Sequence, residues 1–211
     1  MSGPIRPSES AVVEVIESIR SQFPGCQIFL STWTDSELVR SKVDHYQAIP
    51  EPADRDILHS VHSRTIQQLE LKLSDNTPGC ALSLYKMMFG VQNVCALAQP
   101  HIRDTDKVVR IRTDSMFIFE PAYLAELLAS GDDDYIAKKG DGFDWIAITS
   151  FATLKKTWCF QDIKEYNQEV NLSWNPENLV ARRIPVPVRF LDANRVDMYI
   201  LRKNGYKHYY P

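Results

Sequence analysis

Apolar residues recur along this chain at spacings that change from helical to strand-like and back. In residues 8–23 they lie three or four positions apart, which predicts a helix with one buried side. The next apolar run, 27–33, is short and nearly continuous, and this is typical of a strand covered on both faces. Pro24 and Gly25 lie between the two and predict the end of the helix.

The same patterns extend along the rest of the chain. Strands and helices alternate in the first half, which favours a parallel sheet flanked by helices, and the second half is more mixed. The expected fold is α/β and Rossmann-like, with a mixed, mainly parallel sheet flanked by helices. Further helices are expected at 80–98, 121–128, 151–158 and 175–183, further strands at 42–49, 107–113, 116–119, 145–149, 187–191 and 198–202, and a loop at 131–142.

Composition and charge narrow the class of protein. The chain has 211 residues, a length that suits one domain, and 24 Lys and Arg against 27 Asp and Glu give a net charge of −3. This balance argues against broad nucleic-acid binding, which needs a basic surface. No apolar run approaches the roughly 20 residues of a transmembrane helix, and the start lacks the pattern of a signal peptide. The four cysteines are far apart and are expected to be reduced, mostly buried thiols of a cytoplasmic protein.

The first candidate binding residues follow the strand at 27–33. In an open α/β sheet, ligands bind beyond the carboxyl ends of the strands. Thr32, Trp33 and Asp35 lie there, and an indole can stack on a base while a carboxylate accepts hydrogen bonds from a nucleoside. A helix cap or a turn with a half-buried Trp33 explains the same residues equally well.

The strand at 107–113 carries a second group of candidates. With a period of two, Arg110, Arg112 and Asp114 point to one face. Two guanidinium groups and a carboxylate leading out of a buried strand are costly unless they are paired or liganded. A diphosphate with a divalent metal ion at Asp114 would satisfy all three. The alternative is an internal Arg–Asp network.

Two further residues are candidates for chemistry. Asp144 precedes the strand at 145–149, where its carboxylate could accept a proton from an attacking hydroxyl group, although a plain loop aspartate is equally consistent. His208 lies in a terminal Lys-His-Tyr-Tyr cluster that could fold back and supply a metal ligand. The chain has no P-loop, no G-x-G-x-x-G, no G-x-S-x-G and no H-E-x-x-H motif, which disfavours P-loop ATP hydrolysis, hydride transfer, serine hydrolysis and zinc proteolysis.

Several segments carry a further signal through their order and spacing. They are G-P-I at 3–5, I-E-S-I-R at 16–20, I-F-L-S-T-W at 28–33, R-I-R-T-D at 110–114, D-W at 144–145 and I-L-R at 200–202. Together they resemble the WavE-like lipopolysaccharide-synthesis glycosyltransferases across most of the chain. The S-T-W and R-x-R-x-D pieces are the most specific parts of the resemblance.

The resemblance implies a single GT-A-type domain over residues 1–211. It implies a nucleotide-diphosphate-sugar donor, a glycan or glycolipid acceptor, and a cytoplasmic enzyme of polysaccharide biosynthesis, with peripheral membrane association left open. Asp114 would then contact the metal ion (Mn²⁺ or Mg²⁺) and the diphosphate, with Arg112 beside it. Thr32, Trp33 and Asp35 would border the nucleoside, and Asp144 would be the base.

Two departures from the family pattern leave alternatives open. The position two after Asp114 is Met116, so the second carboxylate of a D-x-D motif is absent and metal dependence is not assured. Only Met1 and Ser2 precede Gly3, where the family has a full first strand, so either the start is a variant or the sheet lacks part of one strand. A sugar nucleotidyltransferase and a catalytically inactive carbohydrate- or nucleotide-binding domain are the competing functions.

Overall fold

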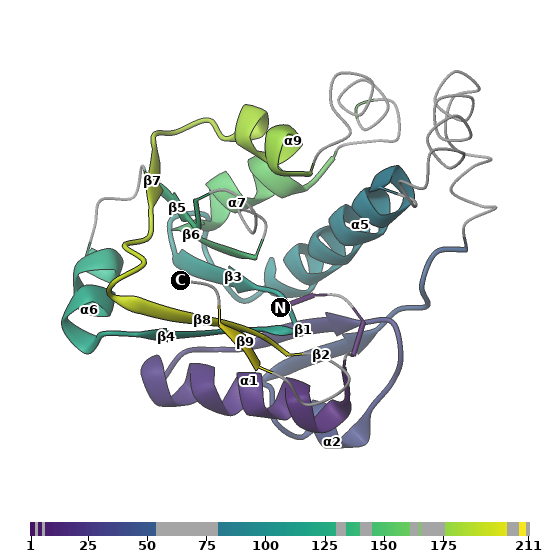
Figure 1. Ribbon diagram of the computed structural model, residues 1–211. Helices are drawn as coiled ribbons and strands as arrows, with labels where there is room; N and C mark the ends of the chain where they lie inside the picture. Colours follow the sequence, from purple (N-terminus) through teal and green to yellow (C-terminus); the bar gives the residue numbers. More distant parts are fainter. Residues whose placement is uncertain are drawn as a thin grey trace.

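In the computed structural model, helices and strands alternate in the first half of the chain and follow one another in a mixed order in the second half (Figure 1). The structure describes residues 1–2, 4–5, 7–53, 80–129, 134–139, 145–160, 165, 176–201 and 207–209, with the backbone alone at 80–84, 176–178 and 207–209. The helices in these ranges are α1 (Glu9–Gln22), α2 (Glu37–Arg40), α5 (Cys80–Ala98), α6 (Pro121–Ala129), α7 (Phe151–Trp158) and α9 (Pro176–Arg183). The strands are β1 (Phe29–Thr32), β2 (His45–Ala48), β3 (Lys107–Ile111), β4 (Ser115–Phe119), β5 (Tyr135–Ala137), β6 (Ile146–Ser150), β7 (Val188–Phe190), β8 (Val196–Leu201) and β9 (Lys207–Tyr209).

Strand pairing is mixed. β1 and β2 are parallel, as are β5 and β7, whereas the pairs β3–β6, β5–β6, β4–β8 and β8–β9 are antiparallel. Ser2 forms isolated parallel bridges to Ser31 of β1 and to Arg112, just beyond β3. The α/β class is therefore confirmed, but most strand pairs among the described residues are antiparallel. The expected mainly parallel sheet is therefore not found: parallel pairing is limited to β1 with β2, β5 with β7 and the bridges of Ser2, and β6 runs antiparallel to both β3 and β5.

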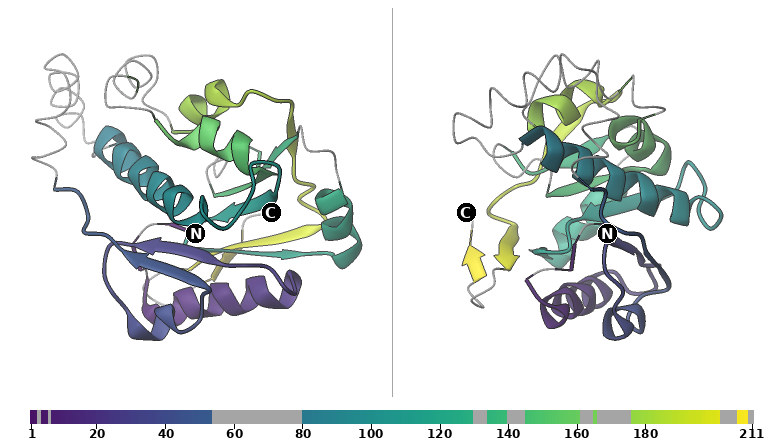
Figure 2. Two further views of the ribbon diagram at one scale, coloured as in Figure 1. Left: turned by 180° about the vertical axis from the view of Figure 1, so that it is seen from behind. Right: turned by 90° about the vertical axis from the view of Figure 1, so that its right-hand side faces the viewer.

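Helices cover the strands from two sides. Figures 1 and 2 show α1 and α2 on one side and α5, α7 and α9 on the other. On the first side, Val12 and Ile16 of α1 pack with Leu30 of β1 in one buried cluster. On the second side, Val91 of α5 and Trp158 of α7 belong to another. The strands β1 and β3 are thus enclosed between two apolar layers.

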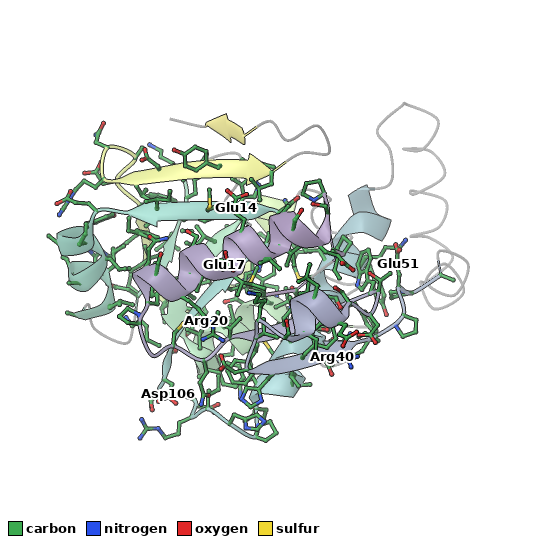
Figure 3. All side chains as sticks on the ribbon, turned by 90° about the horizontal axis from the view of Figure 1, so that it is seen from below. Glu14, Glu17, Arg20, Arg40, Glu51 and Asp106 are labelled. Carbon is green, nitrogen blue, oxygen red and sulfur yellow. The ribbon has the colours of Figure 1, made fainter. Side chains whose placement is uncertain are left out.

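Helix α1 forms where the sequence predicts it. Ser8 caps its amino end, since the Ser8 hydroxyl accepts a hydrogen bond from the Ala11 N–H at 3.2 Å. Its outer face carries charged side chains, which Figure 3 shows along the helix, while Val12, Val15 and Ile16 are buried. The chain leaves the helix through Gly25, whose φ of 78° lies in the left-handed region that glycine adopts without steric cost.

The acidic stretch 131–142 is not a loop throughout. Tyr135, Ile136 and Ala137 form β5, and all three are fully buried. This strand pairs with β6 on one side and with β7 on the other. Three apolar residues are too few to show a period of two. The flanking glycine and aspartate residues therefore led to the prediction of a loop where the structure has a central strand. Helix α2 and strand β9, also short, were missed for the same reason.

The first two residues lie between β1 and β3. Ser2 bridges Ser31 at the end of β1 and Arg112 just beyond β3. The Met1 amino group donates a hydrogen bond to the Phe29 carbonyl oxygen at 2.7 Å, and the Ser31 N–H donates to the Met1 carbonyl oxygen at 3.2 Å. These bonds continue a parallel ladder for two residues beside β1.

Candidate functional site

Parallel strands bring two of the predicted segments to one edge. β1, the Met1–Ser2 segment and β3 run in the same direction, and Ser2 bridges both Ser31 and Arg112. The carboxyl ends of β1 and β3 therefore lie about 10 Å apart, which is two strand spacings. This edge, formed by residues 31–33 of β1 and its continuation and by Arg112–Asp114, is the candidate site.

Arg112 and Asp114 form a bidentate ion pair at this edge. Arg112 Nε donates to Asp114 Oδ1 at 3.0 Å, and Arg112 Nη2 donates to Asp114 Oδ2 at 2.9 Å. The Asp114 side chain is 6% exposed and the Arg112 side chain 24%. A partly exposed guanidinium group held by a buried carboxylate is fixed in orientation, which is what binding a planar or multidentate anion requires.

The pair sits on a turn rather than on a strand. β3 ends at Ile111, and the Ser115 N–H donates to the Arg112 carbonyl oxygen at 3.3 Å, which closes a tight turn into β4. The Thr113 hydroxyl group donates to the Pro4 carbonyl oxygen at 2.8 Å and ties the turn to the amino-terminal segment. The expectation of a strand as far as 113 was therefore wrong beyond Ile111, because β3 and β4 belong to different sheets and the chain must change direction here.

Arg110 is not part of this pair. Its side chain is buried, and its guanidinium carbon lies 4.0 Å from the centre of the Trp158 ring on α7. The ring face attracts the cation and replaces part of its lost hydration. The prediction that Arg110 joins Arg112 and Asp114 is not supported, because Arg110 lies inside the sheet and faces the core under α7.

Thr32 and Trp33 lie at the end of β1 and differ in burial and in hydrogen bonding. Thr32 is fully buried, and its hydroxyl group bonds to the Thr34 carbonyl oxygen at 2.8 Å and the Tyr46 hydroxyl group at 3.0 Å. Its side chain therefore supports the loop after β1 and does not face a ligand. Trp33 is half-buried, and its indole N–H is buried without a hydrogen-bond partner among the described residues.

Asp35 lies on the exposed loop before α2. Both of its carboxylate oxygens accept hydrogen bonds from Arg40 at 2.5 Å, and its side chain is 59% exposed. The hydrogen bond from Arg40 holds the pKa of the Asp35 carboxyl group below its ordinary value. Asp35 is therefore an ionised surface residue, and its oxygens are already engaged.

Asp144 and the side chain of His208 lie outside the described residues. The next residue after Asp144 is Trp145, whose carbonyl oxygen accepts a hydrogen bond from the Arg112 N–H at 3.3 Å. The backbone of His208 belongs to β9, where it pairs with Ile200, and Ile200 pairs with Ser115 on its other side. The carboxyl-terminal strand thus lies two strand spacings from the residue that follows Asp114.

The described residues do not form a metal site by themselves. No group of three His, Cys, Asp or Glu side chains in these ranges is placed to hold an ion. Both carboxylate oxygens of Asp114 accept hydrogen bonds from Arg112. A cation at Asp114 would have to compete with this guanidinium group, so the donor set fits a metal ion poorly.

Sequence reasoning missed two residues that support the site, one through its backbone and one through hydrogen bonds to residues of the loop after β1. Ser2 joins β1 to the Arg112 turn, and nothing in a serine near a chain start predicts such a bridge. Tyr46 donates to or accepts from Thr32 and accepts a hydrogen bond from the Ser36 N–H at 3.0 Å. The strand pattern at 42–49 would have placed Tyr46 beside β1, although not its partners.

None of the helices in the described ranges combines the length and the apolarity that a bilayer crossing demands. No protein-family model, curated protein or solved structure matches this chain.

Proposed function

We propose that the chain is a cytoplasmic glycosyltransferase that transfers a sugar from a nucleotide-diphosphate-sugar donor to a hydroxyl group of a glycan or glycolipid acceptor. The observation that carries the proposal is the Arg112–Asp114 pair at the carboxyl edge of parallel strands, with the Met1–Ser2 segment between it and Ser31 of β1. The carboxyl edge is where open α/β sheets bind nucleotides. The resemblance of the S-T-W and R-x-R-x-D segments to WavE-like glycosyltransferases points to the same edge.

The proposed chemistry uses Arg112 as the charge partner of the departing diphosphate. Cleavage of the bond from the sugar to the diphosphate develops negative charge on the leaving oxygen, and a fixed guanidinium group stabilises that charge. Asp114 would hold Arg112 in this orientation. Trp33 would border the nucleoside base. Thr32 and Asp35 would support the loop after β1 that carries Trp33.

Asp144 is the proposed base that takes the proton of the acceptor hydroxyl group. Its neighbour Trp145 is bonded through the backbone to Arg112, so the start of β6 is anchored at the same edge as the proposed diphosphate position. A divalent ion, Mn²⁺ or Mg²⁺, would help to neutralise the diphosphate when bound. The described donor set does not fit such an ion, so no step is assigned to it.

The test is donor turnover, followed as release of nucleoside diphosphate from a panel of nucleotide-sugars with a mixed glycan acceptor. Arg112→Ala and Asp114→Ala should abolish release while the far-ultraviolet circular dichroism spectrum is retained. Arg195→Ala is the matched control, because Arg195 makes an exposed ion pair with Glu120 that is not part of the site. Full turnover in both site variants would contradict the proposed roles.

A second function is favoured by one specific observation. The Asp114 carboxylate is already neutralised by Arg112, as it would be in the internal ion-pair network of a catalytically inactive nucleotide- or carbohydrate-binding domain. Such a domain would bind a nucleotide without releasing product. Turnover by the parent protein separates the two, and in the enzyme Asp144→Asn should lose turnover while it keeps nucleotide binding.

A further inference from the structure

Two cysteines meet where helices α5 and α7 pack together. Cys95 lies on the last turn of α5 and is buried, whereas Cys159 ends α7 and is half-buried. Both belong to the apolar cluster that includes Leu154 and Trp158. Figures 1 and 2 show the two helices on the same side of the strands. The Cys95 S–H group donates a hydrogen bond to the Cys159 sulfur atom, so the two thiols are in direct contact.

A second contact fixes the two helix ends at the same level. Lys155 is one turn before Cys159, whose N–H donates to the Lys155 carbonyl oxygen at 2.9 Å. Gln99 is one turn after Cys95, and its side-chain oxygen accepts a hydrogen bond from Lys155 Nζ at 2.7 Å. The two contacts, 95 with 159 and 99 with 155, follow opposite directions along the chain. The segments are therefore antiparallel here, and the thiols are held opposite each other.

The two thiols differ in their electrostatic surroundings. The hydrogen bond from Cys95 and the nearby charges of Arg183 and Lys155 lower the pKa of Cys159, although burial acts against them. Arg183 is fixed at this point because its Nη2 donates to the Cys159 carbonyl oxygen at 2.8 Å. The contact with Cys159 and burial raise the pKa of Cys95. Cys159 is therefore the group that ionises first, and Cys95 is the protonated donor beside it.

This arrangement is typical of a reactive thiolate with a resolving thiol. Redox-sensitive cysteines combine a lowered pKa with access to solvent and a second thiol nearby. Hydrogen-bonded sulfur atoms need only small side-chain rotations to reach the separation of a disulfide, about 2 Å. A cysteine that only fills space in a core needs neither a cation nor a second thiol beside it.

We propose that Cys159 and Cys95 form a peroxide-sensitive redox site, at which hydrogen peroxide converts the two thiols into an intramolecular disulfide between α5 and the end of α7. The described residues around the pair supply no other nucleophile in contact with it. The pair is separate from the candidate donor site, and the proposal does not depend on glycosyl transfer.

The reaction has two steps. The Cys159 thiolate attacks one oxygen of hydrogen peroxide, a sulfur–oxygen bond forms, the oxygen–oxygen bond breaks, and hydroxide leaves and is protonated to water. The Cys95 sulfur then attacks the Cys159 sulfenic acid, the sulfur–oxygen bond breaks, and the hydroxyl group leaves as water with the Cys95 proton. The two thiols together lose two electrons, and one peroxide is reduced to two water molecules. A dithiol reductant restores both thiols by exchange.

The disulfide would join the supports of β1 and β3. Gln47 of β2 donates to the Asn93 carbonyl oxygen of α5 at 2.8 Å and to the Ser31 hydroxyl oxygen of β1 at 3.3 Å. Helix α7 directly follows β6, which pairs with β3 and accepts a bond from the Arg112 N–H through Trp145. A covalent bond between α5 and α7 therefore closes a long loop of the unfolded chain and should stabilise the folded protein.

The test treats the full chain with hydrogen peroxide at low protein concentration, alkylates the remaining thiols after denaturation and maps the peptides without reduction. The expected product is a peptide pair joined through Cys95 and Cys159, with Tm raised by about 5 to 10 °C and with full reversal by dithiothreitol. Cys95→Ser should stop at the Cys159 sulfenic acid, which dimedone labels. Cys26→Ser is the matched control, because Cys26 packs in the cluster under α1, and it should form the same bond.

A linked pair in the parent protein that is lost in Cys95→Ser and in Cys159→Ser, and kept in Cys26→Ser, supports the proposal. The peptide map of the parent protein decides the question even where a variant does not fold. Four free thiols after peroxide treatment, or sulfinic acid at Cys159 without a linked pair, overturn the proposal. So does a bond through Cys26 or Cys80, or a covalent dimer on a non-reducing gel. A bond present before peroxide that dithiothreitol does not reduce in the folded protein overturns it in favour of a permanent structural disulfide.

Discussion

Arg112 donates two hydrogen bonds, of 3.0 and 2.9 Å, to Asp114 on the turn between β3 and β4. The carboxylate is almost completely buried and the guanidinium group is partly exposed. Arg112 therefore has the geometry of a positioned cation, while Asp114 has the geometry of the group that positions it. The proposed donor site rests on this relationship.

The pair predicts unequal costs for removing its two members. Arg112→Ala leaves the buried Asp114 carboxylate without its bidentate donor, and we expect a loss of about 2 to 3 kcal/mol in the free energy of unfolding. Asp114→Asn leaves an amide that still accepts from a partly hydrated Arg112, and we expect about 1 kcal/mol. Urea denaturation checks both values. Equal losses, or a larger loss for Asp114→Asn, would contradict the assigned burial of the two groups.

The buried amino group of Met1 predicts a pH dependence. Its pKa falls from 8.0 in the unfolded chain to about 5 in the folded protein, chiefly because burial penalises its charge. The unfolded chain therefore binds more protons than the folded chain between pH 5 and 8, and stability should rise with pH across that window, by up to about 4 kcal/mol.

Thermal unfolding of the protein with an acetylated amino terminus is the control for this prediction. Acetylation removes the titrating amine, so this contribution to the rise with pH should disappear. A slope of the same size after acetylation would assign the pH dependence to other groups.

The thiols on α5 and after α7 predict selective alkylation. A hydrogen bond from Cys95 and the nearby charges of Arg183 and Lys155 lower the pKa of Cys159. The contact with Cys159 and burial raise the pKa of Cys95, and burial raises that of Cys26. Iodoacetamide reacts with the thiolate, so Cys159 should be modified before Cys95 and Cys26 at pH 7.

Peptide mass spectrometry measures the order of modification. Lys155→Met removes one of the two cations that favour the Cys159 thiolate, and the rate at Cys159 should fall. Equal rates at Cys159 and Cys26, or no effect of the lysine substitution, would be inconsistent with this assignment.

Removal of a single hydroxyl group from the short strand β5 should lower the stability of the protein. Trp158 Nε1 donates to the Tyr135 hydroxyl group at 2.9 Å, and both side chains are fully buried. Tyr135→Phe leaves the indole N–H without this acceptor, and we expect a loss of about 1 to 3 kcal/mol in the free energy of unfolding. A chemical-denaturation midpoint unchanged from that of the parent protein would show that Tyr135 is not at the centre of the sheet.

The sequence predicted the elements that have enough residues to show a period. Helix α1, predicted within residues 8–23 and ending before Pro24 and Gly25, is an example. It did not predict β5, whose three residues are defined by pairing on both sides. Local spacing also assigned Arg110 to the same group as Arg112. The tertiary contact with Trp158, which no local pattern encodes, separated them.

The candidate site was predictable in its residues and less so in its geometry. The rule for open α/β sheets placed Thr32 at the carboxyl edge, a period of two grouped Arg112 with Asp114, and the structure brings these two strand ends together across Ser2. The turn at Thr113 and Asp114, and the bidentate bond that makes Asp114 a partner of Arg112, depend on the change of sheet after β3.

The most direct test of the proposed function is thermal melting with a panel of nucleoside diphosphates and nucleotide-sugars, each with Mn²⁺, with Mg²⁺ and with a chelator. One nucleotide at 100 times its Kd should stabilise the protein by about 2.7 kcal/mol and raise Tm by about 5 to 10 °C. The shift should vanish in Arg112→Ala and persist in Arg195→Ala. No shift with any nucleotide, or an undiminished shift in Arg112→Ala, would contradict a donor site at Arg112 and Asp114.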